Sequence, residues 1–336
     1  MNLARPRCFP GLAAVVLTTG IALTGGIASA ACYQHLEIPG PDGQPPVEAI
    51  VWSPCAAAAE TQQLGPYVVR GTRNCAVSGR SLPLIVVSHG QGGTSLGHHD
   101  TAEALADAGF VVVTLNHPGD TFGDDSGAQR LDIFESRPRD VTRVISYMLE
   151  RWPSRRQLDP RSIGVFGFSR GGYTALALAG ATPSARASAA RLCTSIRSLV
   201  NPLCRGLRSG DARVAPEADP RVRAVVVVDP LNLFDETGLQ AVRIPVQLWA
   251  SELGGDGVAL ADIEAIRSAL PRAPDYHVAN GAGHFAYLAP CPPAFKQSAR
   301  RICEDPDGFD RHGWHQTMNA AVTAFFRQHL QTETSP

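Results

Sequence analysis

The feature that most constrains the fold is a serine flanked by glycines, in the segment Gly167-Phe168-Ser169-Arg170-Gly171-Gly172. An apolar run typical of a buried strand, 162–166, precedes it, and a helix-like run, 173–179, follows it. Glycines two residues before and after the serine permit a strand-to-helix turn that is too sharp for Cβ atoms at those positions. The sequence therefore predicts that Ser169 lies at the tip of such a turn, at the positive end of a helix.

Similar apolar runs recur along the chain and alternate with segments of helical spacing. We expect strands at 47–52, 84–88, 110–115, 162–166, 223–229, 246–250 and 276–278, and helices near 99–108, 138–151, 173–179 and 313–330. Continuous apolar runs separated by helices are typical of parallel strands that are buried on both faces. The sequence therefore predicts an α/β fold with a mostly parallel central sheet, helices on both faces, and a β-rich region at 33–80.

One segment, 184–219, interrupts this alternation shortly after the helix that follows Ser169. It is rich in alanine, arginine and serine, and it contains Cys193 and Cys204. We interpret it as a small helical insertion, which serves either as a lid over the site or as a plain surface insertion. The sequence shows no internal repeat and no low-complexity linker, so we expect residues 31–336 to form a single domain.

The N-terminus has the pattern of a secretory signal peptide. Two arginines precede an apolar run over about 12–27, and the small residues Ala28-Ser29-Ala30 follow it. We therefore expect residues 1–30 to be removed, a secreted or periplasmic protein, and no membrane span in the mature chain. Lipid anchoring at Cys32 is a less favoured alternative, because Ser29 stands where a lipoprotein signal has a leucine-like residue. The formal net charge is −1, so no nucleic-acid partner is expected.

Cysteine usage agrees with export to an oxidising compartment. Neighbours in the sequence predict the disulfides Cys55–Cys75, Cys193–Cys204 and Cys291–Cys303, with Cys32 left over, although other pairings remain possible. The cysteines and histidines lack the spacing of a zinc site, so no metal is expected.

A serine hydroxyl is a weak nucleophile unless a nearby base takes its proton. His284 is the candidate base, because it lies in the glycine-rich loop 280–285 after the last expected strand, and we expect it to be exposed at the loop tip. We expect the other histidines to be structural or to lie near the pocket. His277 is placed in a strand, His312, His315 and His329 on the surface of the final helix, and His98 and His99 where they could line the pocket.

The acid that orients the histidine has three candidates. Asp229 ends the strand 223–229 at the edge where the other site residues are expected, and it is the preferred one. Glu252 and Asp256 follow the next strand and remain alternatives.

Two backbone N–H groups are needed to stabilise an oxyanion. The residue after the nucleophile, Arg170, is one candidate donor, and Gln91 in the glycine-rich loop 88–93 is the other. Such a loop could instead bind phosphate, but its spacing is not G-x-G-x-x-G and no acidic residue ends the next strand. No cofactor is therefore expected.

These motifs together resemble the platelet-activating factor acetylhydrolase and predicted dienelactone hydrolase group of α/β-hydrolases. The resemblance covers about 80–300 and rests on 88–92, 109–112, 116–120, the segment around Ser169, 228–230 and 283–285. It implies the α/β-hydrolase fold, the acid at Asp229, and oxyanion donors at Gln91 and Arg170. Dienelactone hydrolases use a cysteine nucleophile, so Ser169 departs from their pattern and lactone specificity is not implied.

The sequence thus predicts a serine hydrolase that cleaves carboxylic esters, short-acyl or lipid-like, through an acyl-enzyme formed on Ser169. The same residues would also suit an amidase, a thioesterase or a polyester hydrolase. A hydrolase-fold binding protein without catalysis is the alternative from a different class. Apolar loop residues are candidates for an acyl pocket, namely Phe122, Phe285, Tyr287 and Leu288.

Overall fold

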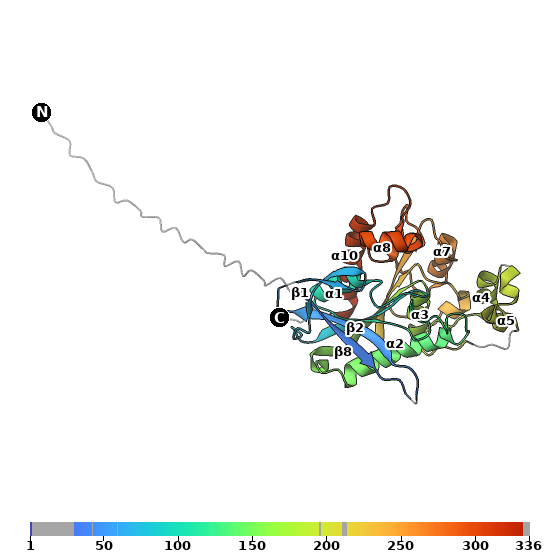
Figure 1. Ribbon diagram of the computed structural model, residues 1–336, viewed down its shortest axis with the longest axis horizontal. Coiled ribbons are helices and arrows are strands. Elements are labelled where there is room, and N and C mark those ends of the chain that lie inside the picture. The colour runs from blue at the N-terminus through green and yellow to red at the C-terminus, as the bar shows by residue number, and fades with distance from the viewer. Residues whose placement is uncertain (2–29, 42, 59, 195, 210–213, 332–336) are drawn as a thin grey trace.

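The structure is a computed structural model that describes Met1 and residues 30–331, except 42, 59, 195 and 210–213. The expected signal peptide, apart from its first and last residues, lies outside the described residues. The described residues form a nine-stranded sheet in the order β11-β10-β9-β8-β6-β7-β2-β1-β5 (Figure 1).

Six neighbouring strands of this sheet are parallel, as the apolar runs predicted. They are β6 (Leu82–Ser88), β7 (Val111–Leu115), β8 (Leu158–Phe168), β9 (Val222–Val228), β10 (Val246–Ser251) and β11 (Asp275–Ala279). All residues of β6 and β7 are buried, because helices cover both faces of the sheet.

The N-terminal region is β-rich, as expected. Strands β1 (Ala30–Ile38) and β2 (Val47–Cys55) pair antiparallel, and β2 pairs antiparallel with β7. The short strand β5 (Thr72–Arg73) closes the edge, while β3 (Thr61–Leu64) and β4 (Tyr67–Arg70) form a separate two-stranded sheet. The disulfide between Cys55 and Cys75 ties the end of β2 to the segment after β5.

Helices lie on both faces of the sheet and enclose two apolar cores. One face carries α2 (Ile133–Glu150), α3 (Arg170–Leu178) and α7 (Leu260–Ala269). The other carries α1 (His99–Asp107) and α10 (Arg311–Leu330), which lie side by side. The remaining short helices are α6 (Glu236–Leu239), α8 (Pro293–Ser298), α9 (Arg300–Cys303) and the 3₁₀ turns Arg155–Gln157, Ile196–Leu199 and His284–Tyr287. Within the described part of the chain, no helix has both the length and the apolar character needed to cross a membrane.

The expected helical insertion is present as α4 (Ala185–Leu192) and α5 (Pro202–Ser209), which lie at the periphery beyond α3 (Figure 1). The predicted Cys193–Cys204 disulfide joins them. Asn201 donates a hydrogen bond of 2.9 Å to Gln129 Oε1, which links the insertion to the loop before α2.

Helix α2 begins five residues before the position that the sequence predicted, and Pro138 lies inside it. Proline has no N–H, so it leaves the carbonyl four residues earlier, that of Phe134, without its helical partner. The hydroxyl of Tyr173 on α3 donates a hydrogen bond of 3.0 Å to that carbonyl. A side chain of the neighbouring helix thus compensates for the proline, and this long-range compensation could not be inferred from local sequence.

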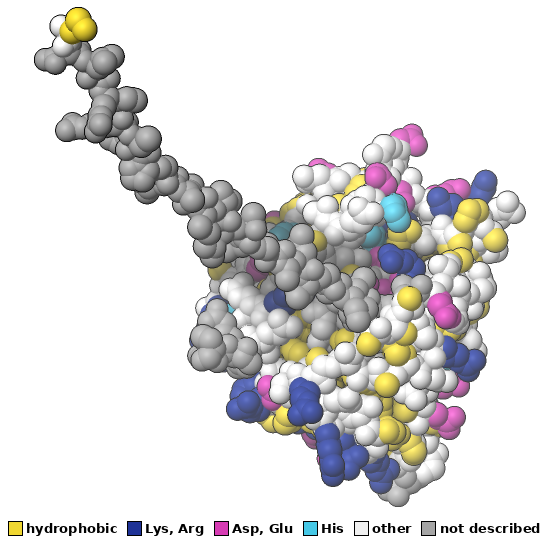
Figure 2. All heavy atoms as spheres, turned by 90° about the vertical axis from the view of Figure 1, so that its left-hand side faces the viewer, with side chains coloured by type: hydrophobic (Ala, Val, Ile, Leu, Met, Phe, Trp, Pro, Cys, Tyr) yellow, Lys and Arg dark blue, Asp and Glu magenta, His cyan; other side chains and the backbone are white. Residues whose placement is uncertain are grey.

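The face of the molecule on the side of β1 and α1 carries charges of both signs. Figure 2 shows basic side chains along the lower and right-hand margins of this face, with acidic side chains between them. This mixture agrees with a net charge close to zero.

Gly164 in the middle of β8 allows α10 to pack directly on the sheet. A Cβ added there would lie 2.7 Å from a ring carbon of Phe326 and 2.9 Å from a methyl carbon of Leu330, both on α10. It would also lie 2.8 Å from Ile85 on β6. These distances are below van der Waals contact, so an added methyl would fit only if these three buried side chains shifted.

We expect Gly164→Ala to lower the free energy of unfolding by about 1–3 kcal/mol, because the added methyl overpacks the core between β8 and α10. Chemical denaturation with urea measures the change. Gly123→Ala is the matched control, because a Cβ at Gly123 meets nothing within 4 Å. Equal stability of the two variants would contradict this account of the packing.

Candidate active site

Ser169 lies between β8 and α3 in a backbone conformation that non-glycine residues rarely adopt. Its φ is 55° and its ψ is −116°. The Ser169 N–H donates to the carbonyl of Val228 at 2.9 Å, and its carbonyl accepts from the N–H of Leu231 at 2.9 Å. Both bonds lead to the end of β9, so the neighbouring strand stabilises the strained turn.

The glycines around Ser169 permit close backbone approach. A Cβ on Gly167 would lie 2.0 Å from the carbonyl oxygen of Gly171, and one on Gly171 would lie 1.9 Å from the carbonyl oxygen of Ser88. A Cβ on Gly172 would lie 2.8 Å from Pro230. The turn therefore packs against the ends of both β6 and β9, which brings the loops after those strands next to Ser169.

His284 and Asp229 form a buried hydrogen-bonded pair. The Nδ1 of His284 lies 2.6 Å from Oδ2 of Asp229, and the two residues are 2% and 0% exposed. Ser251 donates to the same carboxylate from its backbone N–H at 2.9 Å and from its hydroxyl at 2.6 Å. Because the carboxylate accepts from Nδ1–H, the neutral imidazole has its lone pair on Nε2.

His284 is buried, so the expectation that it is exposed at the loop tip is wrong. Its N–H donates to the carbonyl of Gly254 at 2.8 Å, which folds its loop back onto the loop that follows β10. The ring of Phe168 packs on the imidazole with 4.7 Å between centroids. Contacts with segments that are distant in the sequence thus bury a loop whose glycine content predicted exposure.

The two other candidate carboxylates have different partners. Glu252 is exposed and accepts a hydrogen bond of 2.6 Å from the N–H of Gly281. Asp256 is exposed and forms an ion pair with Arg301. Of the three carboxylates, Asp229 is the one that is hydrogen-bonded to His284.

The loop 88–93 passes beside Ser169. A Cβ added to Gly90 would lie 3.2 Å from Cβ of Ser169. Gln91 follows in this loop, and its side-chain oxygen accepts a hydrogen bond of 2.6 Å from the guanidinium of Arg170. The side chains of the two residues that carry the candidate oxyanion donors are therefore in contact.

A second Ser–His–Asp chain, which the sequence analysis missed, begins at Ser88, the first residue of this loop. His117 Nε2 is 2.9 Å from the Ser88 hydroxyl, and its Nδ1 is 3.0 Å from Asp140. Burial, together with the charge of Arg137, lowers the pKa of His117 well below its ordinary value, so the ring is neutral. Ser88 is fully buried, which denies a substrate access to its hydroxyl. Ser88 and His117 both lie in motifs that carried the family resemblance. This was the sequence signal that could have revealed the second Ser–His–Asp chain.

Tyr287, proposed for an acyl pocket, belongs to the core. It is fully buried, and its ring packs on Trp314 with 4.9 Å between centroids. Phe122 is 84% exposed, whereas Phe285 and Leu288 are half-buried. Phe285 contacts the imidazole of His284, with 5.4 Å between centroids, so it lies next to the candidate base.

His98 and His99 have different surroundings at the start of α1. His98 is buried, with its ring 5.3 Å from those of both Phe166 and Phe168, so it supports the residue that packs on His284. His99 bonds to Glu103 and lines a cavity of about 430 Å³ between α1 and α10. Neither Ser169 nor His284 lines that cavity.

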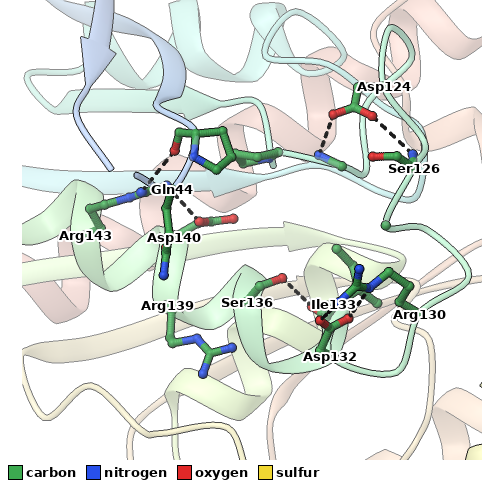
Figure 3. Close-up of a pocket in the computed structure, with 14 residues that line it drawn as sticks. Gln44, Asp124, Ser126, Arg130, Asp132, Ile133, Ser136, Arg139, Asp140 and Arg143 are labelled. Atoms are coloured by element: carbon green, nitrogen blue, oxygen red, sulfur yellow. Dashed lines mark hydrogen bonds and ion pairs between the residues drawn. The ribbon is translucent and has the colours of Figure 1, made fainter. Parts of the chain in front are cut away.

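A cavity of about 520 Å³ lies beside α2, with Asp140 in its wall (Figure 3). Its wall carries charges of both signs, from Arg130, Arg139, Arg143, Asp124, Asp132 and Asp140. Asp140 is also the end of the buried chain to Ser88, and burial raises the pKa of its carboxyl to about 7, while Arg143 opposes that rise. Ser169, Asp229 and His284 do not line this cavity, so it is separate from the candidate active site.

His315 was expected on the surface of the final helix, but it is only 2% exposed. Its Nδ1 lies 2.6 Å from Asp100 and its Nε2 lies 2.8 Å from the carbonyl of Ala286. Both partners are acceptors, so both ring nitrogens carry protons and His315 is an imidazolium. It therefore anchors the 3₁₀ turn that begins at His284 to α1 and α10.

Among the described residues, no group of three or more His, Cys, Asp or Glu is arranged so that it could hold a metal ion.

The comparisons with known proteins agree with this architecture. A family model described as the alpha/beta hydrolase fold matches residues 83–203. A ferulic acid esterase from Streptomyces cinnamoneus has a similar structure, with a TM-score of 0.62, 18% sequence identity, and 94% of each chain covered. A dienelactone hydrolase from Anabaena variabilis is also similar, with a TM-score of 0.51, 14% identity, and 88% of this chain and 97% of that chain covered. No curated protein matches the chain in sequence. The chain is therefore an α/β-hydrolase in fold, as the motif resemblance implied.

We expect His315→Gln to destabilise the protein by about 1–3 kcal/mol between pH 5 and 6, because a buried charged hydrogen-bonded pair is broken. Burial alone would lower the pKa of His315, and Arg311 opposes protonation, but Asp100 raises the pKa above its ordinary value. A raised pKa stabilises the folded state fully below the unfolded value of about 6.5. The difference from the parent should therefore shrink as the pH rises through the folded pKa.

Urea unfolding of both proteins at several pH values tests this expectation. His312→Gln is the control, because His312 is exposed on the same helix, and it should change little at any pH. A His315→Gln effect that is constant from pH 5 to 9 would show that the imidazolium charge is not what stabilises the turn.

Proposed function

We propose that this protein is a serine hydrolase that cleaves carboxylic esters through an acyl-enzyme. The observation that carries the proposal is the buried His284–Asp229 pair, which lies on the same sheet edge as the strained turn at Ser169. The likeness to a ferulic acid esterase adds an analogy at the level of the fold, while the argument for an ester substrate rests on the site.

In the proposed mechanism, Ser169 Oγ attacks the ester carbonyl carbon while Nε2 of His284 takes the hydroxyl proton. Asp229 accepts from Nδ1–H, so it keeps the ring oriented and stabilises the imidazolium that forms. The N–H groups of Gln91 and Arg170 stabilise the tetrahedral oxyanion. The imidazolium then protonates the departing alcohol, and water releases the acid by the same steps.

Ser251 supports this role of Asp229. A buried carboxylate is costly unless hydrogen bonds compensate for the lost water. The two bonds from Ser251 and the one from His284 satisfy both carboxylate oxygens. These bonds hold the carboxylate of Asp229 in place to accept from Nδ1–H of His284 in the proposed reaction.

We expect the substrates to be small-molecule or lipid esters, either short-acyl or lipid-like. Amides, thioesters and polyesters would be cleaved by the same groups, and they differ from simple esters in the leaving group. Hydrogen bonds between histidine and aspartate are not enough to indicate an enzyme, because the buried chain from Ser88 has them as well. The reason to favour an enzyme is that the His284–Asp229 pair lies on the same sheet edge as the strained turn at Ser169.

We further propose that the protein acts in a secreted or periplasmic setting. The described residues form three disulfides, Cys55–Cys75, Cys193–Cys204 and Cys291–Cys303, and these favour an oxidising compartment. The remaining described cysteine, Cys32, is buried, and its Sγ lies 3.0 Å from the N–H of Cys75. A lipid-modified thiol would have to be exposed, so this burial argues against anchoring at Cys32.

We expect Ser169→Ala to lower kcat on p-nitrophenyl acetate by about 10⁴-fold or more, because no acyl-enzyme can form. A fluorophosphonate probe should label the parent protein and leave the variant unlabelled. Turnover at the parent rate in Ser169→Ala would refute the mechanism. An unlabelled, inactive parent would favour the binding protein.

We expect Asp229→Asn to lower kcat by about 10³- to 10⁴-fold, because the amide removes the charge that stabilises the imidazolium. Glu252→Gln and Asp256→Asn are matched controls, and each should stay within about twofold of the parent. The same ester assay compares all three variants. Parent turnover in Asp229→Asn, with a large loss in one of the other two, would assign the acid differently.

A further inference from the structure

We propose that the side chain of Arg170, together with Asp120 and Arg137, positions the oxyanion hole and gives it a positive electrostatic potential. This inference rests on the proposed function. It assigns a role to side chains, whereas the proposed mechanism uses only the backbone N–H groups of Gln91 and Arg170.

Arg170 joins the two halves of the proposed oxyanion hole. Its backbone follows Ser169, and its guanidinium reaches across to the side-chain oxygen of Gln91 at 2.6 Å. The other terminal nitrogen donates to Asp120 at 2.9 Å and to the carbonyl of Ala128 at 3.1 Å. One residue thus holds three groups that are separated in the sequence, and through Gln91 it holds the loop that carries the second N–H donor.

Asp120 holds the loop that carries Gln91 in place. Its Oδ1 accepts from the N–H of Gly92 at 3.3 Å, and its Oδ2 accepts from Arg137 at 2.7 Å as well as from Arg170. Arg137 also donates to the carbonyl of His89 and to the Ser88 hydroxyl. The backbone on both sides of Gln91 is therefore attached to this cluster.

The cluster has an excess of positive charge. The side chains of Asp120 and Arg137 are 0% exposed and that of Arg170 is 6% exposed, so two guanidinium groups share one buried carboxylate. Two further carboxylates act on these arginines through their charge, Asp140 on Arg137 and Asp256 on Arg170. Each of them is shared with another arginine, since Asp140 pairs with Arg143 at 3.0 Å and Asp256 pairs with Arg301.

The excess charge is present at neutral pH. Burial lowers the pKa of Arg137 to about 10, which leaves its guanidinium protonated. An uncompensated buried charge is unfavourable in the resting protein. It becomes favourable when a negative charge forms beside it, and the proposed reaction forms one on the substrate oxygen, next to Gln91 and Arg170.

The first test variant is Gln91→Met. It removes the side-chain oxygen that Arg170 binds and retains the backbone N–H donor, and its exposed position should leave folding intact. The second variant is Arg170→Met, which removes the guanidinium. We expect each to lower kcat on p-nitrophenyl acetate by about 10- to 100-fold while KM stays within about twofold.

The double variant tests whether the two side chains act together. If Gln91 Oε1 acts through Arg170, the double variant should have the kcat of Arg170→Met rather than the product of the two losses. Arg130→Met is the matched control. Arg130 is an exposed arginine in the loop before α2, and it pairs with Asp132. It should have the parent kcat.

Inhibition by a trifluoromethyl ketone separates positioning from a merely structural role. This inhibitor forms a tetrahedral oxyanion with the serine, so its affinity should fall in parallel with kcat/KM across the variants. A structural role would lower the melting temperature and leave the inhibitor affinity of the folded protein unchanged. Parent kcat and parent inhibitor affinity in Gln91→Met and Arg170→Met would overturn the inference. If Arg170→Met does not fold, Gln91→Met decides alone.

These experiments distinguish a failure of this inference from a failure of the proposed function. A parent enzyme that is labelled at Ser169, together with unaffected Gln91→Met and Arg170→Met variants, overturns only the role of the side chains. A parent that is unlabelled and inactive overturns both.

Discussion

The close backbone contact between the turn at Ser169 and the end of β6 is the constraint on which the site depends. Gly171 lies so near the carbonyl of Ser88 that any side chain there would collide with it. This contact brings the loop 88–93 against the serine, and the bonds from Ser169 to Val228 and Leu231 bring the end of β9 there too. Ser169, Gln91 and Asp229 come together because three strands end at one place.

Much of this arrangement follows from local sequence. The valine-rich run before Asp229 predicts a doubly buried strand, and the glycines around Ser169 predict its turn, because each pattern has few physical alternatives. The surroundings of His284 and His315 could not be predicted. Glycines around His284 favoured an exposed loop, and the helical position of His315 favoured a surface, whereas both are buried by segments far away in the sequence. Pro138 is similar, since its compensation by Tyr173 depends on the packing of α2 on α3.

Charge placement links stability and the proposed chemistry. The imidazolium of His315 stabilises the turn of His284 from one side of the sheet edge, and the arginines around Asp120 hold the loop of Gln91 from the other. Each of these positive groups costs desolvation. The imidazolium pairs with Asp100, whereas the two guanidinium groups share the single carboxylate of Asp120. The candidate base and the candidate oxyanion donors are thus fixed by separate ionic clusters, so they can be perturbed independently.

The buried chain of Ser88, His117 and Asp140 has a consequence for methods that identify active sites from the arrangement of side chains. It has the same side-chain types and the same order of donors and acceptors as a hydrolytic triad, within a single chain that also carries Ser169, His284 and Asp229. A template search based on distances alone would return Ser88 as a nucleophile. What distinguishes the two serines is solvent access and the turn that lifts one of them above the sheet, so accessibility belongs in any such template.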